Sequence, residues 1–484
     1  MISISNKQYW LIEQYNLNPG RTAFISKEKT VLYERLAVLA IKAADKFSKS
    51  GIKKNSRVAI LTNRASDFFI AVNALWFLGA VPVPINPKLT NEEIEKQLSR
   101  IDAEFILAGP GSPKFSSTRV IKNISFSILD ESSKIDENFD PALFTSIYSA
   151  EINLSDNALI MFTSGSTGEA KGVVHTFKSL LESVIATDSF SELSSNDRWL
   201  ASLPFYHIGG FMILVRALIT GSSVIFPDEQ NYEGIKDTIG YFSPTHISLV
   251  PTMLQRMLNE NQNFNKSLKI IYLGGGPSSE SVSIKSAELG LPVVKVYGST
   301  ETCSMATALH PADLKTQPGS SGKVIGRNRI KIIDEEIYVS SASLFKEYFN
   351  DRIATEEKVK DGWFRTGDYG RIDSGEYLFV ESRREDIIIT GGENVSALEV
   401  EEAIKQFAGI KDAFVFPLQD TVWGQIVCAA IVADNFMEEE LKTFLRSKLG
   451  AFKIPKKFFV VESIPKNEMG KINRAKLLSA LKSD

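Results

Sequence analysis

The chain has 484 residues, of which 43% are hydrophobic and 23% are charged, which is typical of a soluble globular protein with large cores. Its 55 Lys and Arg nearly balance its 58 Asp and Glu, which argues against a nucleic-acid binding protein. Its two cysteines are too few for a disulfide framework or a structural zinc site made of cysteines alone. No apolar run approaches the roughly 18 residues that span a bilayer, and the N-terminus lacks the order of a signal peptide, so we expect a multidomain cytoplasmic enzyme.

Short apolar strands alternate with helices along most of the chain. Arg57–Leu61 predicts a buried strand, Ser66–Gly79 predicts a helix, and the prolines of Val81–Ile85 place that extended segment near a sheet edge or a strand end. Thr90 and Glu93 form a capping box that begins the next helix. Strand–helix alternation predicts parallel sheets with helices on both faces. It resumes with expected strands at Ser223–Phe226, Thr245–Val250, Lys269–Leu273 and Val293–Val296.

Two passages interrupt this alternation. Gly109–Ile152 is rich in Ser, Asn, Asp and Pro and predicts irregular surface structure between two α/β halves. Asp373–Arg384 is a turn-rich passage, after which smaller elements follow, including helices at Ser396–Gln406 and Glu438–Leu449. We place a domain boundary near Arg383–Asp386. This gives a large N-terminal α/β domain of stacked sheets over residues 1–384 and a small α+β C-terminal domain over residues 385–484.

The strongest local signal is Leu159–Gly172, LIMFTSGSTGEAKG, in which an apolar strand runs into a loop of small polar residues. Its hydroxyl groups, backbone N–H groups and the Lys171 ammonium suit a polyanion, although a Ser/Gly loop can equally be a flexible connection. Lys171 directly precedes Gly172, so the loop does not match the Walker A pattern. The candidate phosphate ligands are Thr163, Ser164, Gly165, Ser166, Thr167, Gly168 and Lys171.

This loop closely resembles the signature loop of the adenylate-forming superfamily, which includes acyl-CoA synthetases, luciferases and adenylation domains. The superfamily usually has Pro where this chain has Ala170. The resemblance implies that a carboxylate attacks the α-phosphate of ATP to give an acyl-adenylate and pyrophosphate, and that a thiol then displaces AMP. Further segments resemble family motifs in the family's order: PFYHIG at Pro204–Gly209, LGGGP at Leu273–Pro277, YGSTE at Tyr297–Glu301, GWFRTGDYG at Gly362–Gly370, ESRREDIIITGGEN at Glu381–Asn394 and PKNEMGKINR at Pro465–Arg474.

The resemblance implies a nucleotide site with four principal side chains. Glu301 would ligate Mg²⁺, Asp368 would accept hydrogen bonds from the ribose with Arg383 nearby, and Tyr297 would stack on adenine. From the residues alone, Glu301 could instead be a surface acid, Asp368 part of a turn and Tyr297 a core residue. The remaining nucleotide-binding candidates are Gly274, Gly275, Gly276, Pro277, Gly298, Ser299 and Thr300.

The resemblance also implies a catalytic lysine on a mobile C-terminal domain. Lys471 would bridge the carboxylate and the α-phosphate and would leave the site before the thiol enters, although a lysine near a C-terminus is ordinarily a solubility residue. Glu385 would be the hinge pivot, where the family often has Asp or Lys. Gly391, Gly392 and Glu393 would face the active site in the thiol-accepting pose.

Within the superfamily, several segments are most similar to the o-succinylbenzoate–CoA ligases of menaquinone biosynthesis, whose substrate has a second carboxylate. Arg216 would bind that carboxylate or, alternatively, extend to solvent from its helix. His207 would line the acyl pocket or be a core histidine. Ser248, Thr302 and Ser304 are further polar candidates for this pocket. The segments that carry this similarity are YGSTETCS at Tyr297–Ser304, LGGGP at Leu273–Pro277, HISLVPTML at His246–Leu254 and Trp423–Gly424.

We expect ATP, a small carboxylic acid and coenzyme A as partners, Mg²⁺ as cofactor, no nucleic acid and no membrane span, with a homodimer left open. The chain carries no Asp-Ser carrier-domain signal, which favours free CoA as the thiol. Cys303 and Cys428 are expected to be packing residues, because the acyl group travels as an adenylate. Alternatives are a fatty-acyl or other aryl-CoA ligase, a D-alanine–carrier ligase, and an inactive protein that binds nucleotide or acyl-CoA.

Overall fold

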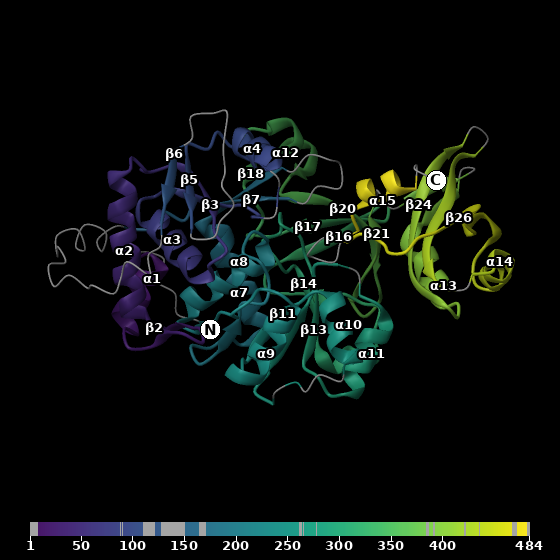
Figure 1. Cartoon of the computed structure of the whole chain (residues 1–484), viewed down its shortest axis with the longest axis horizontal. Helices are drawn as coiled ribbons and strands as arrows, with labels where there is room; N and C mark the ends of the chain where they lie inside the picture. Colours follow the sequence, from purple (N-terminus) through teal and green to yellow (C-terminus); the bar gives the residue numbers. More distant parts are fainter. Residues whose placement is uncertain are drawn as a thin grey trace.

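The computed structural model of the chain consists of a large N-terminal part and a smaller C-terminal unit at one end of the molecule (Figure 1). This agrees with the two-domain α/β architecture predicted from the sequence. The structure describes residues 8–87, 89, 91–109, 122–126, 151–163, 171–260, 264, 266–276, 278–383, 387–390, 393–420, 423–434, 436–466 and 472–481. The predicted boundary near residue 384 and the capping residue Thr90 fall outside these ranges.

A nine-stranded sheet forms the centre of the N-terminal part, in the order β15-β14-β13-β12-β11-β9-β10-β1-β2. Its central strands are parallel, as predicted, but antiparallel pairs complete both edges. The strands are β1 (Thr22–Ile25), β2 (Thr30–Leu32), β9 (Arg198–Leu200), β10 (Ser223–Ile225), β11 (His246–Leu249), β12 (Ile270–Leu273), β13 (Val293–Tyr297), β14 (Thr307–Leu309) and β15 (Lys323–Val324).

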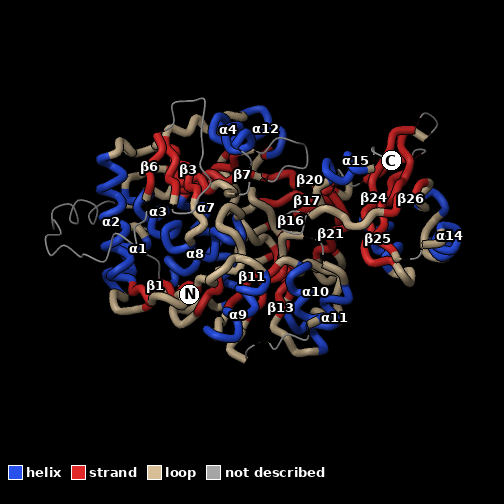
Figure 2. The backbone as a smooth tube through the Cα atoms, viewed as in Figure 1, coloured by secondary structure: helices blue, strands red, loops and turns tan. Residues whose placement is uncertain are grey.

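Helices cover both faces of this sheet (Figure 2). Neighbouring residues of one strand point to opposite faces, so Trp199 and Leu200 belong to two different hydrophobic cores. The first face packs against α1 (Trp10–Leu17), α2 (Tyr33–Lys49), α3 (Ala65–Phe77), α7 (Phe177–Ser191) and α8 (Ile208–Thr220). The second face packs against α9 (Tyr232–Phe242), α10 (Pro251–Asn259) and α11 (Glu280–Glu288).

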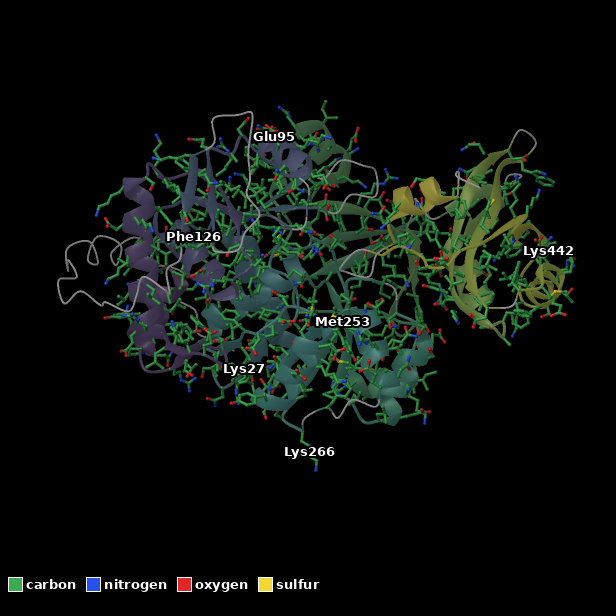
Figure 3. All side chains as sticks on the ribbon, viewed as in Figure 1. Lys27, Glu95, Phe126, Met253, Lys266 and Lys442 are labelled. Atoms are coloured by element: carbon green, nitrogen blue, oxygen red, sulfur yellow. The ribbon has the colours of Figure 1, made fainter. Side chains whose placement is uncertain are left out.

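A parallel four-stranded sheet, in the order β4-β3-β5-β6, lies near the N-terminus. The proline-containing β4 (Val81–Pro84) is an edge strand, as predicted, beside β3 (Arg57–Leu61), β5 (Phe105–Ala108) and β6 (Lys122–Ser125). Phe126, labelled in Figure 3, is buried against Phe47 with ring centroids 6.0 Å apart. A strand and a core residue therefore lie inside the segment that was expected to be irregular throughout. Helix α4 (Asn91–Arg100) precedes β5.

Two antiparallel sheets, which strand–helix alternation does not predict, complete the N-terminal part. One pairs β7 (Asn157–Phe162), β8 (Gly172–Thr176) and β18 (Glu347–Tyr348), and it carries the predicted phosphate loop between β7 and β8. The other contains β16 (Arg329–Ile333), β17 (Glu336–Ser340), β19 (Val359–Lys360), β20 (Trp363–Ile372) and β21 (Leu378–Arg383), with α12 (Arg352–Lys358) preceding β19. The prediction of a turn-rich passage over Asp373–Arg384 was wrong for its second half, because β21 pairs with β20 there.

The C-terminal unit is a five-stranded sheet with helices on both faces. Helices α13 (Ala397–Lys405) and α14 (Glu438–Arg446) share one hydrophobic core with the sheet, and α15 (Arg474–Ala480) packs on the other face. The strands are β22 (Ile387–Thr390), β23 (Glu393–Ser396), β24 (Ile410–Asp420), β25 (Gly424–Ala433) and β26 (Lys457–Val460). Helix α13 contacts β21, so the two parts of the chain meet there. Within the described ranges, no helix is long and apolar enough to cross a membrane.

Candidate active site

The base of the predicted phosphate loop is closed by two hydrogen bonds between its first and last residues. The Thr163 N–H donates to the Lys171 carbonyl at 3.0 Å, and the Lys171 N–H donates to Thr163 Oγ1 at 3.1 Å. These bonds continue the β7–β8 ladder and fix the spacing of the loop ends. Ser164, Gly165, Ser166, Thr167 and Gly168 lie outside the described residues, so their phosphate contacts stay predictions.

Tyr348 connects this loop to Glu301. Its hydroxyl donates to Glu301 Oε1 at 2.8 Å, and the Lys171 ammonium nitrogen lies 4.9 Å from its ring centroid. Burial and the Glu301 charge raise the pKa of Tyr348, which keeps its hydroxyl protonated as a donor. A pocket of about 500 Å³ opens beside Lys171 and Tyr348 and is also lined by Arg100. Sequence reasoning missed Tyr348 because only the pairing of β18 with β8 brings it to this place.

Glu301 lies on a loop that joins β13 and β14 and requires unusual backbone geometry. A side chain at Gly298 would begin 1.5 Å from the Ser304 carbonyl oxygen, so only glycine fits there. Cys303 and Ser304 adopt φ angles of 57° and 87°, in the left-handed region that is unfavourable for residues with a side chain. The Thr302 hydroxyl accepts from the Ser299 N–H at 2.8 Å and donates within the loop. It therefore stabilises the loop itself, and its role in the acyl pocket stays a prediction.

Four successive carbonyls of this loop, those of residues 300–303, are held by four different partners. The Thr300 carbonyl lies 2.8 Å from His175 Nε2, and the Glu301 carbonyl accepts from the Phe345 N–H at 2.8 Å. Ser343 donates to the Thr302 carbonyl at 3.1 Å, and Ser183 donates to the Cys303 carbonyl at 2.6 Å. The partners come from β8, α7 and the segment before β18, so several elements fix this loop together.

The predicted nucleotide residues gather at the carboxyl ends of β12 and β13, where ligands bind in open parallel sheets. The Tyr297 hydroxyl donates to Asp368 Oδ2 at 2.8 Å. Asp368 is largely buried on β20, and its backbone is paired with that of Arg383 on β21. After β12, Gly274 packs so closely that a side chain there would begin 2.7 Å from Val296, and Gly275 has a φ of 85°. Pro277 is not among the described residues.

Arg216 lies on α8, and His207 directly precedes this helix as its N-cap residue. His207 is half-buried, with its ring 4.8 Å from that of Tyr206. Arg216 is 1% exposed, so the alternative in which it extends to solvent was wrong. Its Nη2 lies 3.4 Å from Ser304 Oγ, which joins the acyl side to the Glu301 loop.

Arg216 is a buried cation for which the described part of the chain supplies no carboxylate partner and no hydrogen bond at Nε. Its guanidinium carbon lies 5.5 Å from the centroid of the Trp199 ring, a cation–π contact. Burial lowers the pKa of Arg216, because desolvation disfavours the charged form. An anion that entered beside Arg216 would therefore gain a charge-assisted partner at this place.

The Trp199 ring on β9 contacts the ring of His246 on the adjacent strand β11 and the ring of Tyr272 on β12. It stacks on His246 at 4.5 Å and on Tyr272 at 5.9 Å. Burial lowers the pKa of His246 to about 4, so this ring is neutral beside Arg216. Ser248 follows His246 by two residues on β11 and therefore faces the same side of the sheet. Sequence reasoning missed this aromatic wall, because strand pairing brings its three members together.

The C-terminal candidates are described less fully. Lys471, Glu385, Gly391 and Gly392 fall in gaps between the described ranges, and Glu393 is placed only by its backbone at the start of β23. Their predicted roles stay predictions. Cys303 and Cys428 are both buried free thiols, as expected for packing residues.

Mg²⁺ fits the residues that surround Glu301. The described residues contain no group of three or more His, Cys, Asp or Glu that could hold a metal ion by themselves. Mg²⁺ usually needs only one or two carboxylates when phosphate oxygens supply further ligands. Glu301 presents a carboxylate that is oriented by Tyr348 and lies near the predicted phosphate loop.

Two family models match the chain. Residues 11–349 match the AMP-binding enzyme family, and residues 399–471 match the AMP-binding enzyme C-terminal domain. The chain belongs to the AMP-binding enzyme family. The match covers both parts of the fold and includes the phosphate loop, the Glu301 loop and the Lys471 segment.

Several relatives within this family carry the same activity name. The 2-succinylbenzoate–CoA ligase of Listeria monocytogenes is 34% identical over 97% of this chain and 98% of the relative. The ligase of that name from Bacillus subtilis is 31% identical over 99% of each chain. The B. subtilis o-succinylbenzoate CoA synthetase (MenE) with its acyl-adenylate OSB-AMP matches with a TM-score of 0.89, 31% identity and 97% coverage of both chains.

His175 should make the stability of the protein depend on pH. Its pKa is lowered from 6.5 to about 4, chiefly by burial, so the folded state keeps it neutral where the unfolded state takes up a proton. Its stabilising contribution is therefore complete above pH 6.5 and is lost as the pH falls towards 4. Urea unfolding between pH 6.5 and 5 should show that the wild type loses about 1 to 2 kcal/mol more than His175→Gln. Equal losses would contradict a neutral buried His175.

Proposed function

We propose that the chain is an ATP-dependent 2-succinylbenzoate–CoA ligase. One carboxylate oxygen attacks the α-phosphorus of ATP, so that pyrophosphate leaves and an acyl-adenylate forms. The CoA sulfur then attacks the acyl carbon, and AMP leaves with the electrons of the broken C–O bond. The observation that carries the choice of acid is the buried Arg216, which lacks a carboxylate partner in the described part of the protein.

The charge of Arg216 favours an acid with two carboxylates. A buried cation without a partner costs several kcal/mol, so a bound anion beside it would offset a large penalty. One carboxylate of 2-succinylbenzoate must react at the phosphate, which leaves the second for Arg216. The relatives that are named for this acid match 97% and 99% of the chain, which supports the same choice. A fatty acid has a single carboxylate and would leave Arg216 without a counter-charge.

The nucleotide would lie between the phosphate loop and the carboxyl ends of β12 and β13. We assign Asp368 to the ribose hydroxyls, with Tyr297 as its hydrogen-bond donor beside the base, and Thr163 and Lys171 to the phosphates. Glu301 would hold Mg²⁺, which would neutralise phosphate charge when bound. A B. subtilis MenE structure with ATP and magnesium ion matches with a TM-score of 0.88 at 31% identity, and it covers 97% of this chain and 99% of that one.

The TM-scores support a placement of the two domains like that in MenE structures with ATP or with the acyl-adenylate, which is the placement expected for the first half-reaction. TM-scores are 0.89 and 0.88 against MenE with OSB-AMP and with ATP and magnesium, but 0.73 against a MenE double mutant with the product analogue OSB-NCoA. Identity is 31% and coverage of this chain 97% in all three cases, so sequence divergence does not explain the lower score. We therefore propose a hinge near Glu385, about which residues 385–484 rotate as a domain. In the first half-reaction this domain brings Lys471 to the site. In the second half-reaction it brings Gly391–Glu393 there.

CoA is the proposed thiol, and the cytoplasm is the proposed compartment. The names of the relatives support CoA over a carrier protein.

The function is tested directly by acid-dependent release of pyrophosphate. Purified protein with ATP and Mg²⁺ should release pyrophosphate with 2-succinylbenzoate, and added CoA should convert the adenylate to the thioester. Benzoate, a fatty acid and D-alanine should support at least about tenfold lower kcat/KM, a difference of about 1.4 kcal/mol. Turnover of the fatty acid without response to 2-succinylbenzoate would replace the proposed acid, and no turnover of any acid would favour an inactive binding protein.

Arg216→Met should separate dicarboxylic from monocarboxylic acids. It keeps most of the side-chain volume but removes the charge, so KM for 2-succinylbenzoate should rise at least about 30-fold, from the loss of about 2 kcal/mol. KM for benzoate should change little. Because the described residues supply no carboxylate partner for this charge, urea unfolding should show no loss of stability. Arg256→Met, at an exposed arginine that pairs with Glu233 and Glu260, is the matched control. Equal KM changes for both acids would remove Arg216 from the pocket.

Lys471→Ala should separate the two half-reactions. We expect it to nearly abolish adenylate formation, which needs a cation between two anions, and to leave thioester formation from preformed adenylate largely intact. Single-turnover assays of each step measure this difference. Equal losses in both steps would contradict domain rotation.

A further inference from the structure

We propose that Tyr348 is a positioning residue of the metal–nucleotide site, which orients the Glu301 carboxylate with its hydroxyl and supports the Lys171 ammonium with its ring. This role rests on the proposed function, in which Glu301 holds the metal and Lys171 meets phosphate. It adds a residue outside the motifs that point to that function, and it predicts an effect on metal binding that needs no acid substrate.

The backbone of Tyr348 is fixed on both sides. Tyr348 lies opposite Val173 in the ladder between β18 and β8, and the Phe349 N–H donates to the Gly172 carbonyl at 2.8 Å. The Tyr348 N–H donates to Thr355 Oγ1 at 3.0 Å. The strand that carries Tyr348 is thus joined to the residue that directly follows Lys171.

The ring of Tyr348 is equally constrained. It is 4% exposed and packs on Phe345 with ring centroids 4.8 Å apart. Phe345 also holds the Glu301 carbonyl through its N–H at 2.8 Å. The backbone and the carboxylate of Glu301 are therefore both positioned from the same short segment.

A tyrosine suits this place because it contacts both charges without neutralising either. Lys171 and Glu301 form no direct ion pair within the described part of the structure. A direct pair would have to break before the ammonium could meet phosphate and the carboxylate could meet Mg²⁺. Tyr348 gives the carboxylate a hydrogen bond and gives the ammonium an aromatic face, so both charges remain available to the nucleotide complex.

The alternative is that Tyr348 only fills the core, and two substitutions separate these roles. Tyr348→Phe removes the hydrogen bond to Glu301 but keeps the ring beneath Lys171. Tyr348→Leu removes both contacts. If Tyr348 is only a packing residue, neither change should affect metal affinity selectively.

Metal affinity can be measured as Mn²⁺ binding to the enzyme–ATP complex by electron paramagnetic resonance, without acid and therefore without turnover. Loss of a residue that orients a metal ligand typically weakens metal binding 10- to 100-fold, so Tyr348→Phe should weaken Mn²⁺ binding at least about tenfold. Calorimetric binding of ATP without metal should stay unchanged in Tyr348→Phe and weaken about fivefold or more in Tyr348→Leu, through loss of the cation–π contact.

Glu301→Gln provides the decisive comparison. It should weaken Mn²⁺ binding by itself, and adding Tyr348→Phe should cause little further loss, because the two residues act on one ligand. Tyr33→Phe is the matched control: Tyr33 is another buried tyrosine, whose hydroxyl donates to the Ala217 and Ser222 carbonyls at 2.9 and 2.7 Å. It should lower the unfolding temperature without changing Mn²⁺ affinity.

Mn²⁺ affinity within twofold of wild type in Tyr348→Phe would overturn the proposal, as would fully additive losses in the double variant. If Tyr348→Leu does not fold, Tyr348→Phe and the double variant still decide the question. These outcomes are independent of the acid, so a wrong acid in the proposed function would leave the metal-binding result intact.

Discussion

The active site depends on a short loop whose backbone cannot relax. The carbonyls of residues 300–303 are held by His175, Phe345, Ser343 and Ser183 in turn, while Gly298 leaves no space for a side chain. The left-handed φ angles of Cys303 and Ser304 are unfavourable in isolation, and the surrounding hydrogen bonds stabilise them. This loop carries Glu301, which accepts a hydrogen bond from Tyr348, and Ser304, which lies 3.4 Å from Arg216 Nη2, so one constraint positions two of the candidate site residues.

The positive charges of Arg216 and Lys171 are the second feature on which the proposed reaction depends. Joining a carboxylate to ATP brings anions together, so the site must hold positive charge that its own acids do not cancel. Arg216 and Lys171 meet this requirement in different ways: Arg216 is buried beside an aromatic wall, and Lys171 lies over the Tyr348 ring. In both places an aromatic ring, and not a carboxylate, faces the cation. Burial of the Arg216 charge destabilises the protein without ligand, and an anionic ligand that binds beside Arg216 would offset this cost.

The sequence predicted well those features that are local in the chain. The strand, loop and lysine of residues 159–172 form a continuous motif, and family order brought Tyr297 and Asp368 into one site, where they are hydrogen-bonded. Features that depend on strand register were not predictable. His175, Tyr348 and the Trp199–His246–Tyr272 stack are each far in sequence from the residues they support. Helical periodicity could not say whether the Arg216 side chain is buried or reaches solvent, and only the packing of the folded chain shows that it is buried. The antiparallel sheets were missed because strand–helix alternation predicts parallel pairing.

We propose that Arg216 and the Glu301 loop together hold one acid between a buried cation and the nucleotide. A crystal structure of the protein with the acyl-adenylate of 2-succinylbenzoate tests this most directly. We expect the unreacted carboxylate within hydrogen-bond reach of the Arg216 guanidinium, the ribose hydroxyls at Asp368, and no change in the backbone of residues 298–304. An unreacted carboxylate that points to solvent, with Arg216 still without an anion, would contradict it.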